Sequence, residues 1–353
     1  MLHQRNRGES LKENIFGKNL KECETLMVEH GEAKYRGGQL FQWLYQKKSH
    51  DFSEMTNFSN KLRENLSQNY TLIHGNIIRT QEDSQDGTKK YLIELSDGEC
   101  IESVLMHYQH GASLCVSTQA GCNMGCKFCA STQGGKIRDL TSGEILDQIF
   151  LIEEVEKIRV SNIVIMGIGE PLDNYVEVLK FIRIANTGFG IGQRKISLST
   201  CGLVPGIRLL AEENLQINLA ISLHSVFQEQ RKDLMPIANK YDLKELLAAI
   251  DDYFIKTGRQ ITYEYALMEG FNDRDVDING LVKLLRGTQN HLNLIGLNEV
   301  GEVDYKESSR LDSFFRELEK RGINVTMRRK MGREIDAACG QLRKKGNKDK
   351  VIV

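Results

Sequence analysis

The sequence predicts an α/β protein in which a complete or partial parallel barrel follows a small helical region and a β-hairpin. Three observations support this class. Helical patterns fill the first seventy residues, β-rich patterns follow to about residue 107, and strands then alternate with helices. Such alternation is typical of βαβ units with a parallel sheet. A chain of 353 residues has room for one large α/β domain and a smaller one.

The first part of the chain is expected to form three short helices and then a hairpin. The helices are predicted near residues 20–30, 38–47 and 60–69. The stretch GTKKYLIELSDGECIESVLMHY holds two β-rich runs around the turn residues Asp97 and Gly98, which favour a hairpin. We therefore divide the chain into a helical domain (1–70), a hairpin extension (71–106), a main α/β domain (107–340) and a basic tail (341–353).

Seven strand-like runs mark the main domain. They are expected at residues 113–118, 162–166, 195–199, 218–223, 260–266, 292–297 and 324–327. Amphipathic helical stretches, such as 142–155 and 242–254, lie between most of them. Five or six such units predict a barrel whose chemistry lies at the carboxyl ends of the strands.

The most informative motif follows the first of these strands. In GCNMGCKFC, three cysteines, Cys122, Cys126 and Cys129, share one short loop. Clustered thiolates select zinc, copper(I) or an iron–sulfur cluster. A structural zinc site normally has a second pair of ligands at short spacing, and none follows here. Three cysteines would leave one corner of a four-iron cluster open to a substrate.

Polar residues recur at the ends of later strands. Gly169 and Glu170 belong to a GIGEP turn, where glycine permits close approach to a ligand and the carboxylate suits an ammonium group. Hydroxyl, imidazole and amide groups at the same rim suit hydrogen bonds to a ribose and a carboxylate. These candidate ligand-binding residues are Ser199, Ser222, Leu223, His224 and Asn298.

Composition narrows the function class. The formal net charge is -1, so the charge of the whole chain does not indicate nucleic-acid binding. The segment from Arg328 to Lys350 is locally basic, with nine basic and three acidic residues. Eight cysteines are too few for a disulfide scaffold. The polar start lacks the apolar core expected of a signal peptide, and no long apolar run predicts a membrane span. A cytoplasmic enzyme is expected.

Several motifs together resemble a known family. The C-x3-C-x2-C spacing with Phe128 before the last cysteine resembles the cluster loop of radical S-adenosylmethionine (SAM) enzymes. With the GEPL, LST, SLH, LMPI and IDAACGQL stretches, the whole chain resembles the RlmN/Cfr family of radical SAM RNA methyltransferases. This resemblance implies a partial (β/α)6-type barrel, one [4Fe-4S] cluster on the three cysteines, and two SAM molecules per turnover at the rim residues.

The resemblance also implies catalytic roles. Cys339 matches the methyl-carrying cysteine, Cys115 its partner near the cluster, and Glu102 a proton acceptor. The implied reaction methylates carbon 2 of a specific adenosine in 23S rRNA, and in tRNAs, through methyl-cysteine, a transient protein–RNA crosslink and a disulfide. An external donor such as flavodoxin or ferredoxin supplies electrons, the helical domain contacts RNA, and a monomer is expected. The CAST run and Pro171 resemble the RlmN branch.

Three alternatives remain open at this point. A Cfr-type enzyme would methylate carbon 8 of adenine in 23S rRNA. A zinc-stabilised RNA-binding module would have no catalytic activity. A radical enzyme acting on a protein or a small molecule would not need Cys339.

Overall fold

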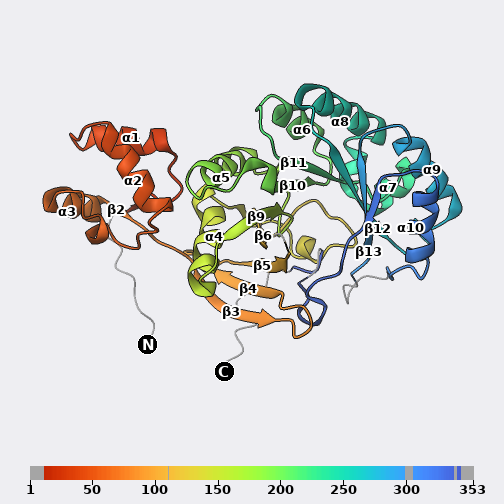
Figure 1. Ribbon diagram of the computed structural model, residues 1–353, viewed down its shortest axis with the longest axis horizontal. Helices are drawn as coiled ribbons and strands as arrows, with labels where there is room; N and C mark the ends of the chain where they lie inside the picture. The colour runs from red at the N-terminus through yellow and green to blue at the C-terminus, as the bar shows by residue number, and fades with distance from the viewer. Residues whose placement is uncertain (1–11, 110, 299–304, 338–339, 343–353) are drawn as a thin grey trace.

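A computed structural model describes residues 12–109, 111–298, 305–337 and 340–342. Its central feature is one ten-stranded sheet with the order β14-β13-β12-β11-β10-β9-β6-β5-β4-β3. The sheet curves so that most helices lie on its outer face, and its two edge strands do not meet (Figure 1). The predicted class, an α/β protein with a partial barrel, is confirmed.

Seven strands of this sheet are parallel and form the barrel wall. They are β6 (Gly111–Cys115), β9 (Val160–Ile165), β10 (Ile196–Thr200), β11 (Asn218–Ser222), β12 (Ile261–Leu267), β13 (His291–Gly296) and β14 (Val325–Met327). Each overlaps one of the seven predicted runs. These strands could be predicted because both of their faces are buried. Helices cover the outer face and side chains fill the barrel interior on the other, so each strand has a nearly continuous apolar sequence.

Helices connect the parallel strands. They are α4 (Ser142–Glu156), α5 (Tyr175–Thr187), α6 (Val204–Ala211), α7 (Gln228–Leu234), α8 (Leu243–Thr257), α9 (Asp275–Leu285) and α10 (Leu311–Lys320). Local signals set their ends. Thr141 and Glu144 form a capping box at the start of α4, and Gly258, with a φ of 64°, ends α8 in the left-handed conformation.

The other edge of the sheet is antiparallel. Strands β4 (Lys89–Glu94) and β5 (Cys100–Tyr108) form the predicted hairpin around Gly98, and β5 continues antiparallel onto β6. A third strand, β3 (Asn76–Glu82), pairs with β4 at the edge. Sequence reasoning did not separate β3, because its side chains are mostly exposed and its NIIRTQE sequence shows weak alternation.

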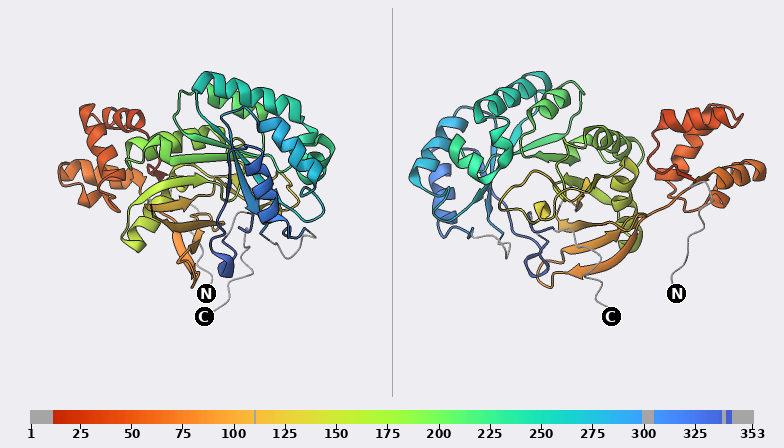
Figure 2. Two further views of the ribbon diagram at one scale, coloured as in Figure 1. Left: turned by 45° about the vertical axis from the view of Figure 1, so that its right-hand side comes forward. Right: turned by 180° about the vertical axis from the view of Figure 1, so that it is seen from behind.

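The amino-terminal part forms a helical unit beside α4 and α5 (Figure 2). It contains α1 (Leu20–Glu29), α2 (Tyr35–Tyr45) and α3 (Asn60–Asn69), as expected, plus a short parallel pair of β1 (Glu13–Asn14) and β2 (Tyr70–Thr71). The predicted domain limits at residues 70, 106 and 340 remain a prediction.

Ion pairs and close backbone packing join this unit to α4. Lys48 pairs with Glu153, and His74 pairs with the buried Asp147. Gly17 and Gly143 lie so close that a Cβ on Gly17 would be 2.6 Å from the Gly143 nitrogen. The helical unit therefore packs tightly against α4. No helix in the described part of the chain is long and apolar enough to cross a membrane.

Candidate active site

The cysteine loop lies at the carboxyl end of β6. A short antiparallel ribbon, β7 (Gln119–Ala120) with β8 (Arg138–Asp139), closes the loop at its base. Gly121 adopts a φ of 79°, and a Cβ there would be 2.0 Å from the Gly135 carbonyl oxygen, so only glycine fits. The local fold thus turns Cys122, Cys126 and Cys129 towards one pocket at the strand ends.

Burial governs the chemistry of these thiols. Burial raises the pKa of Cys122 to about 12, and it also raises the pKa of Cys126 well above its ordinary value. Both thiols therefore keep their protons unless a cation stabilises the thiolates. Within the described residues, no group of three or more His, Cys, Asp or Glu side chains is arranged to hold a single metal ion.

The GIGEP turn forms another part of the pocket wall. Glu170 is 3 % exposed, and its carboxylate accepts hydrogen bonds from the backbone N–H groups of Cys201 at 2.8 Å and Leu172 at 3.0 Å. Burial raises the pKa of this carboxyl. A Cβ on Gly169 would lie 2.6 Å from Cβ of Gln119, which explains the glycine. Glu170 therefore joins the ends of two strands and also lines the pocket.

The predicted rim residues mostly meet in this pocket. Ser199, Ser222, His224 and Asn298 all line it, from the ends of the three strands β10, β11 and β13. Leu223 differs, because its side chain is fully buried in the hydrophobic core. Leu223 is not among the described residues that line the pocket, and its N–H donates to the Glu264 carbonyl at 3.0 Å.

His224 is held as a neutral ring. Its Nδ1 accepts a hydrogen bond from the Ala266 N–H at 3.0 Å, so the proton lies on Nε2. Complete burial lowers its pKa to about 3. The φ of His224 is 52°, in the left-handed region. Its ring meets Phe128 of the cysteine loop edge to face, at 4.7 Å between centroids.

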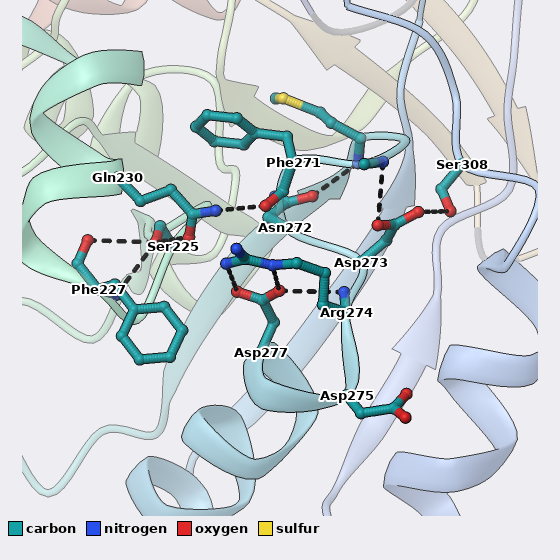
Figure 3. Close-up of polar contacts among 12 residues, drawn as sticks. Ser225, Phe227, Gln230, Phe271, Asn272, Asp273, Arg274, Asp275, Asp277 and Ser308 are labelled. Carbon is teal, nitrogen blue, oxygen red and sulfur yellow. Dashed lines mark hydrogen bonds and ion pairs between the residues drawn. The ribbon is translucent and has the colours of Figure 1, made fainter.

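A polar network behind His224 holds this strained residue. Asn272 donates to the His224 carbonyl at 2.8 Å and accepts from the Met268 N–H at 2.7 Å. Figure 3 shows two further contacts of the loop that carries Asn272: Gln230 donates to the Phe271 carbonyl, and Ser308 donates to Asp273 at 2.6 Å. The rim is thus rigid before any ligand binds.

A second pocket adjoins the first on the side of the antiparallel strands. Cys115 lines it, together with Arg328, Arg329 and Lys330. The two pockets share Met166, Ile295, Asn298 and Arg328. Gly340 lines the first pocket and Leu342 the second, so the described segment 340–342 lies along their boundary.

The remaining candidate, Glu102, lies on β5 near Cys115. Register pairs Val104 with Cys115, and Glu102 is two residues from Val104, so all three share one face of the sheet. Glu102 is 2 % exposed and lies 3.5 Å from Lys90 Nζ. Apolar residues of the segment 331–342 cover this face together with Val104, Met106 and Cys115.

The carboxyl-terminal segment is hydrogen-bonded to the cysteine loop. The Gly340 carbonyl accepts from the Ala130 N–H at 2.7 Å, and Ser131 Oγ donates to the Leu342 carbonyl at 2.8 Å. Cys339, which precedes Gly340 in the chain, lies outside the described residues. No two cysteines among the described residues are joined by a disulfide.

Sequence reasoning missed several residues of the site. Met235, Glu264 and Ala266 also line the first pocket, and Lys90 lies beside Glu102. Glu264 had a usable signal, since it is a charged residue inside the apolar strand ITYEYAL. Lys90 had none, because its role depends on a partner strand and on a segment far along the chain.

The barrel with a three-cysteine loop after its first parallel strand defines a radical SAM protein. The Radical SAM superfamily matches residues 116–279, and the Ribosomal RNA large subunit methyltransferase N-terminal domain matches residues 13–72. The chain belongs to the RlmN family.

Relatives and a solved structure agree with this placement. Two proteins called probable dual-specificity RNA methyltransferase RlmN, from Clostridium perfringens and Lachnospira eligens, are each 49% identical to it. The alignments cover 96% and 95% of this chain and 98% and 97% of those proteins, respectively. The crystal structure of a radical SAM methyltransferase from Sphaerobacter thermophilus superposes with a TM-score of 0.88 at 38% identity, covering 94% of this chain and all of that one.

Proposed function

We propose that this protein is a dual-specificity RNA methyltransferase of the radical SAM type, which methylates carbon 2 of an adenosine in 23S rRNA and in tRNAs. The names of its relatives support the class. One observation carries the proposal for this chain: the hydrogen bond from Ala130 to the Gly340 carbonyl ties the residue next to Cys339 to the cysteine loop. A methyl carrier must lie beside the radical source.

The residues present fit a [4Fe-4S] cluster and SAM. Three cysteines on one loop offer three thiolates and leave one iron open, and the buried thiols need a cation to ionise. The pocket beside them has the small, polar and acidic groups that a ribose, a carboxylate and an ammonium require. When bound, the cluster and SAM would supply a 5′-deoxyadenosyl radical. The protein would hold and orient both groups and exclude water from the site.

The remaining roles belong to the chain itself. The Cys339 thiolate would take a methyl group from one SAM by displacement. The methyl carbon would lose one hydrogen atom to the radical and join the adenine ring, and the adduct would give one electron back to the cluster. Glu102 accepts the ring proton. The Cys115 thiolate would attack the Cys339 sulfur and break its bond to carbon, and the released carbon would take up a proton to complete the methyl group of the base. The two sulfurs form a disulfide that an external reductant must open. An electron donor such as flavodoxin or ferredoxin and action as a monomer complete the proposal.

RNA is proposed to enter at the second pocket. Arg328, Arg329 and Lys330 line it next to Cys115. Cationic side chains there can pair with phosphates and position the nucleotide without reading its sequence. The adenine would then lie between Cys115 and the shared boundary with the first pocket.

The decisive experiment compares wild-type enzyme with Cys339→Ala. Anaerobically reconstituted protein is given a short 23S rRNA fragment or a tRNA, and the nucleosides are analysed by mass spectrometry. Wild type is expected to yield 2-methyladenosine, C339A none, and the control C23A, which changes a buried cysteine of α1, the wild-type amount.

Other outcomes would correct the proposal. A product of 8-methyladenosine would establish the Cfr-type reaction. Full activity in C339A would exclude the methyl-cysteine route. Zinc in place of iron, with no product from either RNA, would point to a binding module.

A further inference from the structure

Arg231 is a completely buried cation whose guanidinium is only partly satisfied. It lies on α7 and is 0% exposed. Its Nη2 donates to the backbone carbonyls of Cys201 at 2.7 Å and Ser222 at 3.3 Å. Its Nε and Nη1 are buried and make no hydrogen bond within the described part of the chain. An unbalanced charge of this kind is costly to bury, so a counter-charge is expected.

The helix that carries Arg231 packs against the cysteine loop. Three residues farther along α7, the Leu234 carbonyl accepts a hydrogen bond from Lys127 N–H, next to Cys126, at 3.0 Å. In the following turn, Pro236 lies 3.3 Å from where a Cβ on Gly125 would be. Helix α7 and its following turn therefore pack directly against the loop that carries the three cysteines.

Neighbouring residues make room for the guanidinium behind the pocket. Cys201 and Ser222 line the pocket, whereas Arg231 reaches only their carbonyls from behind. Gly202 has a φ of 107°, and a Cβ there would be 3.1 Å from Arg231 Nη2. Arg231 thus clamps the ends of β10 and β11 without being part of the pocket surface.

The ionisable groups around Arg231 are two thiols and the neutral ring of His224, whose pKa is lowered by burial and by the Arg231 charge. Burial lowers the pKa of Arg231, and thiolates at Cys201 and Cys126 would oppose this effect. A guanidinium nevertheless stays protonated in proteins. Cys126 is one of the three proposed cluster ligands. A four-iron cluster held by three thiolates carries a net negative charge, and reduction adds another.

We propose that Arg231 is a positioning residue that supplies a buried positive charge behind the cluster and thereby favours its reduced form. This inference rests on the proposed function, since it requires a cluster on the three cysteines. The cluster is the missing counter-charge of Arg231. The guanidinium, in turn, stabilises the electron that the cluster must accept before SAM is cleaved.

The test is a redox titration of anaerobically reconstituted protein, followed by electron paramagnetic resonance with and without SAM. Arg231→Gln keeps an N–H donor but removes the charge, and Arg231→Lys keeps the charge. Lys232→Gln is the matched control, because Lys232 is the next residue on α7 but is solvent-accessible and paired with Glu229.

A clear pattern is expected. The midpoint potential of R231Q should be more negative than that of wild type whether or not SAM is present. The potential of R231K should return towards the wild-type value, and that of K232Q should not change. An unchanged potential in R231Q with full iron content would overturn the inference. A shift seen only with SAM would overturn it too, and would assign the charge to the SAM carboxylate.

Two further outcomes are kept separate. If wild-type protein binds no cluster, the proposed function fails, independently of Arg231. If R231Q does not fold, the wild-type chain labelled with 15N arginine is studied by electron–nuclear double resonance of the reduced cluster. A nitrogen coupling that persists in Arg328→Lys supports the inference, and the absence of any coupling overturns it.

Discussion

Lys90 Nζ lies 3.5 Å from Glu102 Oε1, and the same ammonium donates to the Asp336 carbonyl at 3.1 Å. Lys90 is 4 % exposed and Glu102 2 %, on the adjacent strands β4 and β5. Lys90 therefore connects the proposed proton acceptor with the segment that leads to Cys339. The ion pair links the antiparallel edge of the sheet to the active site.

Replacing Lys90 with Met should therefore destabilise the protein. The change leaves the Glu102 carboxylate buried without this cation, and breaking a buried pair costs about 3–5 kcal/mol. The free energy of unfolding in urea measures the loss. Lys89→Met is the matched control: Lys89 pairs with Glu156 at a more accessible position, so a loss of about 1 kcal/mol is expected. Equal losses in the two variants would contradict the assignment.

Much of this architecture can be read from local sequence, and some of it cannot. The seven parallel strands and the three amino-terminal helices can be predicted from the pattern of their apolar residues. The cysteine loop is recognisable because its three ligands are close in the chain. Lys90 and Arg231 depend on neighbours brought together only by the fold, so no local pattern marks them. Leu223 is a further case, since its place beside Ser222 and His224 does not reveal that the fold turns its side chain into the core.

Two adjacent glycines of α2 should respond oppositely to alanine. A Cβ on Gly37 would lie 2.3 Å from Cα of Glu24 on α1, whereas a Cβ on Gly38 would meet nothing within 4 Å. Gly37→Ala should therefore destabilise the helical unit by about 1–3 kcal/mol through overpacking. Gly38→Ala should stabilise it by about 0.5–1 kcal/mol, because alanine loses less backbone entropy. Thermal unfolding measures both; a harmless G37A would mean that α1 and α2 pack differently.

Iron content should depend on the loop cysteines alone. Cys126→Ala removes one of the three proposed ligands, so iron and sulfide should fall to a small fraction of the wild-type content after anaerobic reconstitution. Cys201→Ala is the stringent control, since Cys201 lines the same pocket but is outside the loop. It should retain the cluster. Loss of iron in C201A and retention in C126A would reassign the ligands.

The buried His224 should make stability depend on pH. Its folded pKa of about 3 lies below the unfolded value of 6.5, so the unfolded chain binds the extra proton between these values. The stabilising contribution is complete above about pH 6.5 and is lost as the pH falls towards the folded pKa. Within this window the expected slope is about 1.4 kcal/mol per pH unit.

His224→Asn isolates this contribution. Asparagine tolerates the left-handed backbone of His224, and its side-chain oxygen can still accept from the Ala266 N–H, but it has no titrating ring. Urea unfolding of the cluster-free chain between about pH 7 and about pH 5 should therefore show a shallower pH dependence in H224N than in wild type. His107→Asn, at an exposed position of β5, is the control and should keep the wild-type slope. The same slope in H224N and wild type would show that His224 is not held neutral by burial.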